Sequence, residues 1–382
     1  MHKNTNNGFS IMLAILSLSV TLTGCVTPQT RMPAANQANA ADETKKQQML
    51  VLEDYLGNYS KLQFVSSRII TSSTDMCGEK VTAYYGFDYW NNNSFNAVMK
   101  APAQVKFNMN EHYKILHVAP ASPAEKSSLK QGDNLVSIDN WLVPAGKDAN
   151  KLIKEKLALL GKSYAPVALV VSRDGVEVKT SITPVKACDF GVTLAPGDVK
   201  NAYADGKNIV VYKGMMDFFK TDEEIALVLS HELAHNSMKH IDAKQKNAVV
   251  GGIFGLLLDV AAAAAGVNTN GEFTKAGAGL AGNSYSVEFE QEADYVGLYF
   301  MKNAGYDIEH AADFWRRIAV NNSQAITIKT SHPTTPERFV AIESTVAEIN
   351  KKIASGEILK PELKNKNELT AKPATKIEHT IN

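Results

Sequence analysis

The chain has few cysteines, no internal repeat and no excess of charge of either sign. Three cysteines occur among 382 residues, and without a Cys-x-x-Cys pair they make a poor metal site. Forty lysines and arginines balance forty aspartates and glutamates, so the composition offers no electrostatic argument for nucleic acid as a partner. The remainder, with 45% hydrophobic and 21% charged residues, is typical of a globular protein long enough for two or more domains.

The N-terminus has the pattern of a targeting segment. An apolar stretch at residues 11–20 is followed by Leu-Thr-Gly-Cys, which ends at Cys25. This resembles a bacterial lipoprotein signal and implies removal of residues 1–24, lipid on Cys25 and a membrane anchor. An ordinary signal peptide or a short membrane anchor is the alternative. Val26 stands where aspartate would suggest inner-membrane retention, so we expect a periplasm-facing lipoprotein in the outer membrane of a Gram-negative bacterium. Residues 25–48 are polar and predict a flexible tether.

The two other cysteines suit an exported protein. With Cys25 lipidated, Cys77 and Cys188 remain, an even number in an oxidising compartment. They flank the middle of the chain, and we expect a disulfide between them that joins the entry of this segment to its exit. Two unpaired thiols are the alternative.

The middle segment has a recognisable order of elements. The pattern predicts strands at 113–118 and 135–138, a helix at 148–160 and a hairpin at 167–182. With its Ser-Pro-Ala…Leu-x-x-Gly-Asp run, this order resembles a PDZ domain, which binds peptide ends by strand addition. No glycine-containing carboxylate loop stands out before Tyr113, so a spacer or cleft-lining role is equally open.

One long apolar stretch, residues 248–266, is interrupted only by Asp259. By length it could span a bilayer. A single span would separate His231 from everything downstream, so we favour a buried or cleft-covering helix, with shallow membrane contact as the alternative.

A His-Glu-x-x-His motif lies at residues 231–235. Two imidazoles four residues apart on a helix share one face, which is the spacing that two ligands of one zinc ion need. Glu232, between them, can activate the zinc-bound water.

The surrounding pattern places this motif in a buried helix. Residues 221–224 form a capping box, which predicts a helix from Asp222 through His240. Apolar residues cover most of its faces, as in a buried helix. On one continuous helix His240 points about 180° away from His231. We therefore expect His240 to be a partly exposed neighbour rather than a ligand.

A second helix, expected at residues 286–303, carries a run of carboxylates. Glu290 lies within its apolar stripe and Asp294 lies at the edge of the stripe one turn later, whereas Glu288 and Glu292 project to the far side. Helical phase therefore predicts Glu290 as the inward carboxylate and places Asp294 to support a histidine.

These motifs together resemble a known family. His-Glu-x-x-His followed by Glu-x-x-Ala-Asp, here Glu290 to Asp294, is similar to the gluzincin family of CaaX-prenyl-proteases and heat-shock membrane proteases. The periplasmic lipoprotein branch fits best. Residues 201–215 resemble the family's edge strand and turn, and the His-Pro-x-x-x-x-Arg run from His332 to Arg338 resembles its late motif.

The resemblance implies one Zn²⁺ per chain, with His231, His235 and Glu290 as ligands. Glu232 would act as general base in peptide-bond hydrolysis.

The later motif supplies the remaining roles. His332 would stabilise the transition state or gate the metal, and Arg338 would tie its loop to Asp294. An extended substrate would lie along an edge strand made of Ile209, Val210, Val211 and Tyr212.

The sequence thus predicts an α+β protein with a mainly helical zincin-like metallopeptidase domain, a small edge sheet and a PDZ-like β-rich domain. The expected order is a signal peptide (1–24), a tether (25–48), an N-terminal segment packing on the body (49–105), the PDZ-like domain (106–185), the peptidase domain (186–350) and a charged, disordered tail (351–382). We expect a zinc endopeptidase acting on misfolded or misassembled envelope proteins. The alternatives are a chaperone or assembly factor with a latent, His-gated zinc site and a PDZ-type adaptor.

Overall fold

The computed structural model describes residues 30–33, 36–246, 249, 256–259, 272, 275, 287–321, 332 and 335–364. The predicted signal peptide, the predicted lipidation site Cys25 and most of the apolar stretch 248–266 lie outside these residues. Within the described ranges, no helix is both long enough and apolar enough to cross a membrane.

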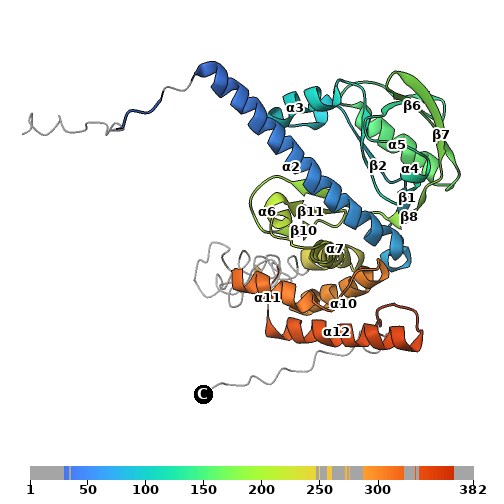
Figure 1. The fold of residues 1–382 in the computed structure, drawn as a ribbon. Coiled ribbons are helices and arrows are strands. Elements are labelled where there is room, and N and C mark those ends of the chain that lie inside the picture. The colour runs from blue at the N-terminus through green and yellow to red at the C-terminus, as the bar shows by residue number, and fades with distance from the viewer. Residues whose placement is uncertain are drawn as a thin grey trace, which may run out of the picture. The chain divides into compact units, whose positions relative to one another are not determined.

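A long helix, α2 (Gln37–Ser72), opens the described chain (Figure 1). The prediction of a flexible tether is wrong for residues 37–48, because this stretch is rich in Ala, Gln, Glu and Lys, which favour a helix even without apolar periodicity. Farther along, Leu62, Val65 and Ile69 are fully buried in the larger hydrophobic core. The second half of α2 therefore belongs to the folded body.

A six-stranded antiparallel sheet forms what we call the β-rich module, residues 87–182. Its strand order is β2-β3-β4-β6-β7, and β5 pairs with β4. The strands are β2 (Phe87–Trp90), β3 (Lys114–Val118), β4 (Asn134–Ile138), β5 (Trp141–Leu142), β6 (Val167–Arg173) and β7 (Val176–Ile182). Its helices are η2 (Asn92–Ser94), α3 (Ala97–Phe107), α4 (Pro123–Lys126) and α5 (Ala149–Gly161). Ile153 and Leu157 of α5 pack into the core of the module.

The module begins earlier than the sequence predicts. Edge strand β2 pairs with β3 across the connection that holds α3, so the expected boundary at residue 106 is wrong. A glycine turn does precede this strand, since Gly86 has a φ of +84° and a Cβ on it would lie 2.2 Å from the Cβ of Ser122. Only glycine fits this position without a rearrangement.

A disulfide closes the neck of the module. Cys77, at the end of η1 (Thr74–Cys77), is bonded to Cys188 with an S–S distance of 1.96 Å, as the sequence predicts. Beside it, β1 (Val81–Tyr84) pairs antiparallel with β8 (Val185–Cys188). The chain therefore enters and leaves the module through the paired strands β1 and β8, next to the disulfide.

Removing this disulfide should destabilise the protein. The two cysteines are 111 residues apart, and closing so long a loop typically contributes about 2–4 kcal/mol by restricting the unfolded chain. We expect the double variant Cys77→Ser, Cys188→Ser to unfold at correspondingly lower urea concentration. Reductant should lower the stability of the parent protein and leave the variant unchanged. Equal stability of the two oxidised proteins would contradict the expectation.

A three-stranded sheet leads into the helical part of the fold. Its strands are β9 (Gly191–Ala195), β10 (Ala202–Ala204) and β11 (Asn208–Tyr212), in the order β10-β11-β9. β11 pairs antiparallel with β10 and parallel with β9. The prediction that Ile209 to Tyr212 form an edge strand is therefore wrong, because β9, which comes earlier in the chain, pairs with the second side of β11.

The body also contains the helices α7 (Asp222–Ser237), α10 (Val287–Asn303), α11 (Ala311–Asn321) and α12 (Pro336–Ser355). The one-turn helix α6 (Lys213–Met216) connects β11 to them. α10 lies between α7 and α12 (Figure 1). Where α10 crosses α7, a Cβ on Gly297 would lie 3.1 Å from the backbone nitrogen of His231. The absence of a side chain at Gly297 thus lets the two helices approach closely.

The charged segment after residue 350 begins as ordered structure. α12 continues to Ser355, and Leu359 packs against the larger core. Lys360 forms an ion pair with Asp75 at 2.6 Å. The prediction of a disordered tail from residue 351 is therefore wrong up to Lys364, and the rest lies outside the described residues.

Candidate metal centre

Four side chains from distant parts of the sequence meet at one point: His231, His235, Glu290 and His332. One potential ligand atom from each lies within 4.8 Å of the others. The first three residues are fully buried, and the side chain of His332 is 13% exposed. Sequence reasoning named all four, and the structure brings them together.

Helix α7 positions the two motif histidines. Thr221 caps it by accepting a hydrogen bond from the Glu224 backbone N–H, as the capping box predicts. One turn apart on this helix, His231 and His235 bring their Nε2 atoms to 3.1 Å. Both Nε2 atoms also face the carboxylate of Glu290, at 3.5 and 3.4 Å respectively. The imidazoles thus present the same ring nitrogen to a common centre.

Helix α10 supplies the carboxylate that helical phase selects. Glu290 is completely buried, whereas Glu288 is exposed and Glu292 is partly exposed. Because Gly297 has no side chain, α10 lies close to the backbone of His231, and the carboxylate of Glu290 reaches the histidines directly.

A buried charge network surrounds the cluster. The Nδ1 of His231 lies 2.9 Å from Asp294. Arg338, on α12, donates two hydrogen bonds of 2.8 Å to Asp294, and its Nη1 lies 2.8 Å from Glu290. The predicted contact between Arg338 and Asp294 is therefore present, and Arg338 also forms an ion pair with Glu290. Trp315, which the sequence did not single out, lies between His231 and Arg338 at ring distances of 5.2 and 5.1 Å.

The pKa values of the cluster follow from burial opposed by charge. Burial alone would raise the pKa of Glu290, but the positive charge of His332 and hydrogen bonds from the histidines hold it well below its ordinary value. Burial alone would lower the pKa of His231, but Asp294 and Glu290 raise it to about 10. Burial lowers the pKa of His235 well below its ordinary value. The carboxylates of Glu290 and Asp294 thus stay ionised and favour a cation beside them.

Glu232 lies beside the cluster without joining it. It is 2% exposed, and its Oε1 lies 3.5 Å from the Nε2 of His332. Its Oε2 is buried and has no hydrogen-bond partner among the described residues. A buried carboxylate oxygen without a partner is costly unless something polar is bound next to it. The orphaned oxygen and the two-imidazole, one-carboxylate donor set therefore fit a metal ion carrying water.

The structure corrects the prediction for His240. α7 ends at Ser237, and Lys239 adopts a left-handed conformation with φ of +59°, so the helix does not continue. His240 turns back into the protein, where it is 1% exposed. Its Nδ1 lies 2.9 Å from the Nδ1 of His235, and its Nε2 lies 2.8 Å from Glu292. The phase argument failed because it assumed one continuous helix.

Asn236 is a second residue that sequence reasoning missed. Its side chain accepts a hydrogen bond from the Gly206 backbone N–H at 2.8 Å and donates one to the Asn208 carbonyl at 3.1 Å. Gly206 lies in the turn between β10 and β11, and Asn208 is the first residue of β11. The hairpin is therefore fastened directly to the helix that carries the metal-site histidines.

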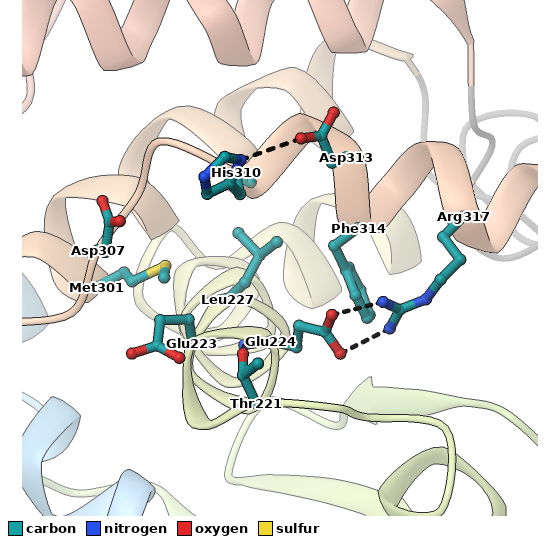
Figure 2. A pocket seen from close by; sticks show the side chains of 11 residues that line it. Thr221, Glu223, Glu224, Leu227, Met301, Asp307, His310, Asp313, Phe314 and Arg317 are labelled. Atoms are coloured by element: carbon teal, nitrogen blue, oxygen red, sulfur yellow. Dashed lines mark hydrogen bonds and ion pairs between the residues drawn. The ribbon is translucent and has the colours of Figure 1, made fainter.

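A separate cavity of about 510 Å³ lies at the start of α7. Figure 2 shows the two-armed ion pair between Arg317 of α11 and Glu224 of α7, with distances of 2.5 and 2.6 Å. Leu227 and Phe314 contribute its apolar lining. None of the four cluster residues lines this cavity, so we assign its residues a role in holding α7 against α11.

A buried His-Glu-x-x-His helix, with a carboxylate from a neighbouring helix beside its two histidines, is the arrangement of a metallopeptidase. Residues 181–346 match the model of Peptidase family M48, and the chain carries a metalloprotease domain of this family. This confirms the family that the sequence motifs indicate.

Named relatives include metalloendopeptidases and proteases. Similarity to mitochondrial metalloendopeptidase OMA1 of Schizosaccharomyces pombe is 27% identity over 192 residues, covering 49% of this chain and 55% of that protein. Similarity to the beta-barrel assembly-enhancing protease of Yersinia pestis is 30% over 139 residues, covering 34% of this chain and 28% of that protein. The chain thus spans about half of the first relative and about a quarter of the second.

The similarity to solved structures is weak. The match to the HtrA3 PDZ domain bound to a phage-derived ligand covers 28% of this chain and 88% of that domain's chain, with 17% identity and a TM-score of 0.21. A score this low carries no argument, and the PDZ-like nature of the module stays a prediction.

Proposed function

We propose that the protein is a zinc-dependent endopeptidase in which His231, His235 and Glu290 hold the metal. The observation that carries the proposal is the convergence of these three side chains beside the partnerless Oε2 of Glu232. Two imidazoles and one carboxylate, with a position left for water, form a common catalytic zinc site. Zinc bound there supplies the Lewis acidity that activates water and polarises the scissile carbonyl.

Glu232 acts as general base and then as general acid. Its buried Oε2 accepts a proton from the attacking water and passes it to the leaving amine. Asp294 keeps the ring of His231 in place by accepting a hydrogen bond from its Nδ1–H, which leaves Nε2 for the metal. Arg338 pairs with both buried carboxylates, offsets part of their charge and so fixes their orientation.

The substrate is proposed to bind as an extended strand along β10 rather than along β11. β10 is an edge of its sheet, with β11 on its other side, and it packs against α7. Backbone groups on such an edge can pair with an extended peptide. Asn236 fixes the β10–β11 turn to α7 and so sets the position of this edge relative to His235.

The proposed substrates are misfolded or misassembled cell-envelope proteins. Two observations support this class: the lipoprotein-like signal ending at Cys25, and relatives named beta-barrel assembly-enhancing protease. Together they favour a lipid-anchored protein of the outer membrane that faces the periplasm.

His332 favours regulation of the site. Its Nδ1 lies 3.0 Å from Glu290 and 3.4 Å from the Nε2 of His231, so it stands where a water or a substrate carbonyl would enter. In this position it would gate the metal; displaced, it could stabilise the oxyanion. A chaperone or assembly factor with a latent zinc site is the alternative function that this contact favours.

A second candidate function belongs to the β-rich module. A groove of about 700 Å³ is lined by residues from Tyr85 to Tyr89, at and just before β2, by Lys154 and Leu157 of α5, and by residues of α2, β1, β8 and β9. Burial raises the pKa of Asp88, within this groove, to about 6. An unpaired strand edge next to a helix can receive a peptide, which favours a peptide-binding adaptor role.

Metal removal tests the endopeptidase. Protein dialysed against dipicolinic acid should lose cleavage of casein and of an unfolded outer-membrane β-barrel protein. One equivalent of zinc should restore the cleavage, and magnesium should not, because it binds imidazole poorly. Cleavage that persists in protein shown to contain no zinc would reject the proposed function.

A further inference from the structure

We propose that His240 and Glu292 are positioning residues that orient His235 toward the metal. The proposal rests on the proposed zinc site and adds two residues that the gluzincin-like motifs do not include. The two form a chain of hydrogen bonds from His235 through His240 to the carboxylate of Glu292. This chain fixes which nitrogen of His235 is offered to the zinc.

The geometry of this chain is continuous. The Nδ1 of His235 lies 2.9 Å from the Nδ1 of His240, and the Nε2 of His240 lies 2.8 Å from Oε2 of Glu292. Both distances are those of ordinary hydrogen bonds. On the other side of the His235 ring, Nε2 lies 3.1 Å from the Nε2 of His231 and faces Glu290. One ring nitrogen of His235 therefore faces the cluster and the other faces the chain.

Only one assignment of protons satisfies all of these contacts with the metal in place. Because Nε2 of His235 must present a lone pair to zinc, its proton resides on Nδ1. The Nδ1–H of His235 then donates to the Nδ1 of His240, which must itself be unprotonated. His240 consequently carries its proton on Nε2 and donates it to Glu292. Glu292 thus sets the tautomer of both histidines.

The local fold holds His240 in this place. The N–H of Met238 bonds to the Ala234 carbonyl and ends α7, and the left-handed Lys239 turns the chain inward. The ring of His240 then packs against the ring of Phe289, with centroids 4.7 Å apart. A turn followed by an aromatic contact leaves His240 little freedom to rotate.

The two zinc-site histidines are therefore supported in parallel from α10. His231 contacts Asp294 directly, whereas His235 reaches Glu292 through an intervening imidazole. The carboxylate that the helical pattern assigned to the far side of α10 thus serves the site through His240. Supporting contacts of this kind typically change metal affinity by about 10–100-fold when they are lost.

The test measures zinc affinity by competition with a chelator of known affinity. Glu292→Gln and His240→Leu should each weaken zinc binding by about 10–100-fold. His240→Asn, whose side-chain oxygen can replace the acceptor atom Nδ1, should recover part of the loss seen with His240→Leu. Glu288→Gln, the same substitution on the same helix, should bind zinc as tightly as the parent protein.

A second readout separates positioning from a general structural role. In ¹⁵N spectra of the zinc-loaded protein, the Nδ1–H of His235 should give a hydrogen-bonded proton signal that Glu292→Gln shifts and Glu288→Gln does not. Melting of the metal-free proteins shows whether each variant still folds. A folded His240→Leu variant with the zinc affinity and Nδ1–H signal of the parent would overturn the proposal. A loss in Glu288→Gln equal to that in Glu292→Gln would also overturn it. A parent protein that binds no zinc would instead reject the proposed function.

Discussion

Replacing Glu232 by Gln should slow peptide hydrolysis by about 10²–10⁴-fold while zinc stays bound. Among the described residues, Glu232 lies 3.5 Å from His332 through Oε1, and its buried Oε2 has no hydrogen-bond partner. The amide of glutamine fills the same volume but cannot accept a proton from water. Proton transfer by a positioned side chain contributes about 10²–10⁴-fold in rate, so kcat should fall by that factor.

The measurement is cleavage of casein and of unfolded outer-membrane protein, with the zinc content of each sample determined in parallel. Glu223→Gln is the matched control, because Glu223 is an exposed residue in the first turn of the same helix. It should cleave at the parental rate. Equal cleavage by parent and Glu232→Gln, both zinc-loaded, would rule out the assigned role of Glu232.

Replacing Arg338 by Met should cost the most stability of any single change at the site. Arg338 is 1% exposed and pairs with two buried carboxylates, those of Glu290 and Asp294. Removing one partner from a buried ion pair leaves uncompensated charge and typically costs about 3–5 kcal/mol. Urea unfolding of metal-free protein measures this loss. Arg316→Met, which removes exposed ion pairs on α11, should change stability by less than about 1 kcal/mol.

The pH dependence of this loss has a defined sign. Burial alone would raise the pKa of Asp294, but the charges of Arg338 and His231 hold it below its ordinary value. A carboxyl whose pKa is depressed by folding stabilises the protein above its unfolded pKa of about 3.9, and the contribution is lost as the pH falls. The difference between parent and Arg338→Met should therefore be greatest at neutral pH and should narrow below about pH 4. A difference that does not change with pH would contradict this account.

Local periodicity was sufficient to choose Glu290 among its neighbouring carboxylates, whereas His332 was chosen from the family resemblance alone. The alternation of apolar and acidic residues along 287–303 placed Glu290 inward and Glu288 outward, and α10 has this phase. The capping box at Thr221 similarly located the start of α7. Such arguments hold within one regular helix, where the angle between side chains is fixed.

The same arguments failed wherever the chain changed direction. The end of α7 at Ser237 and the left-handed Lys239 depend on tertiary contacts of His240, which no local pattern reveals. The central position of β11 depends on its pairing with β9, which comes earlier in the chain. Pairings between separated strands are set by the whole fold, so the edge of the sheet could not be assigned from residues 209–212 alone.

Gly297 makes the metal centre sensitive to the spacing of two helix axes. Zinc accepts ligands only within about 0.2 Å of preferred distances. The separation of α7 and α10 would therefore determine whether the proposed ligands can bind it. A methyl group at Gly297 would meet backbone atoms of His231 at 3.1–3.2 Å and would have to widen this gap by a few tenths of an ångström. The absence of a side chain at Gly297 thus helps to set the ligand spacing of the proposed metal site, although this residue contributes no ligand.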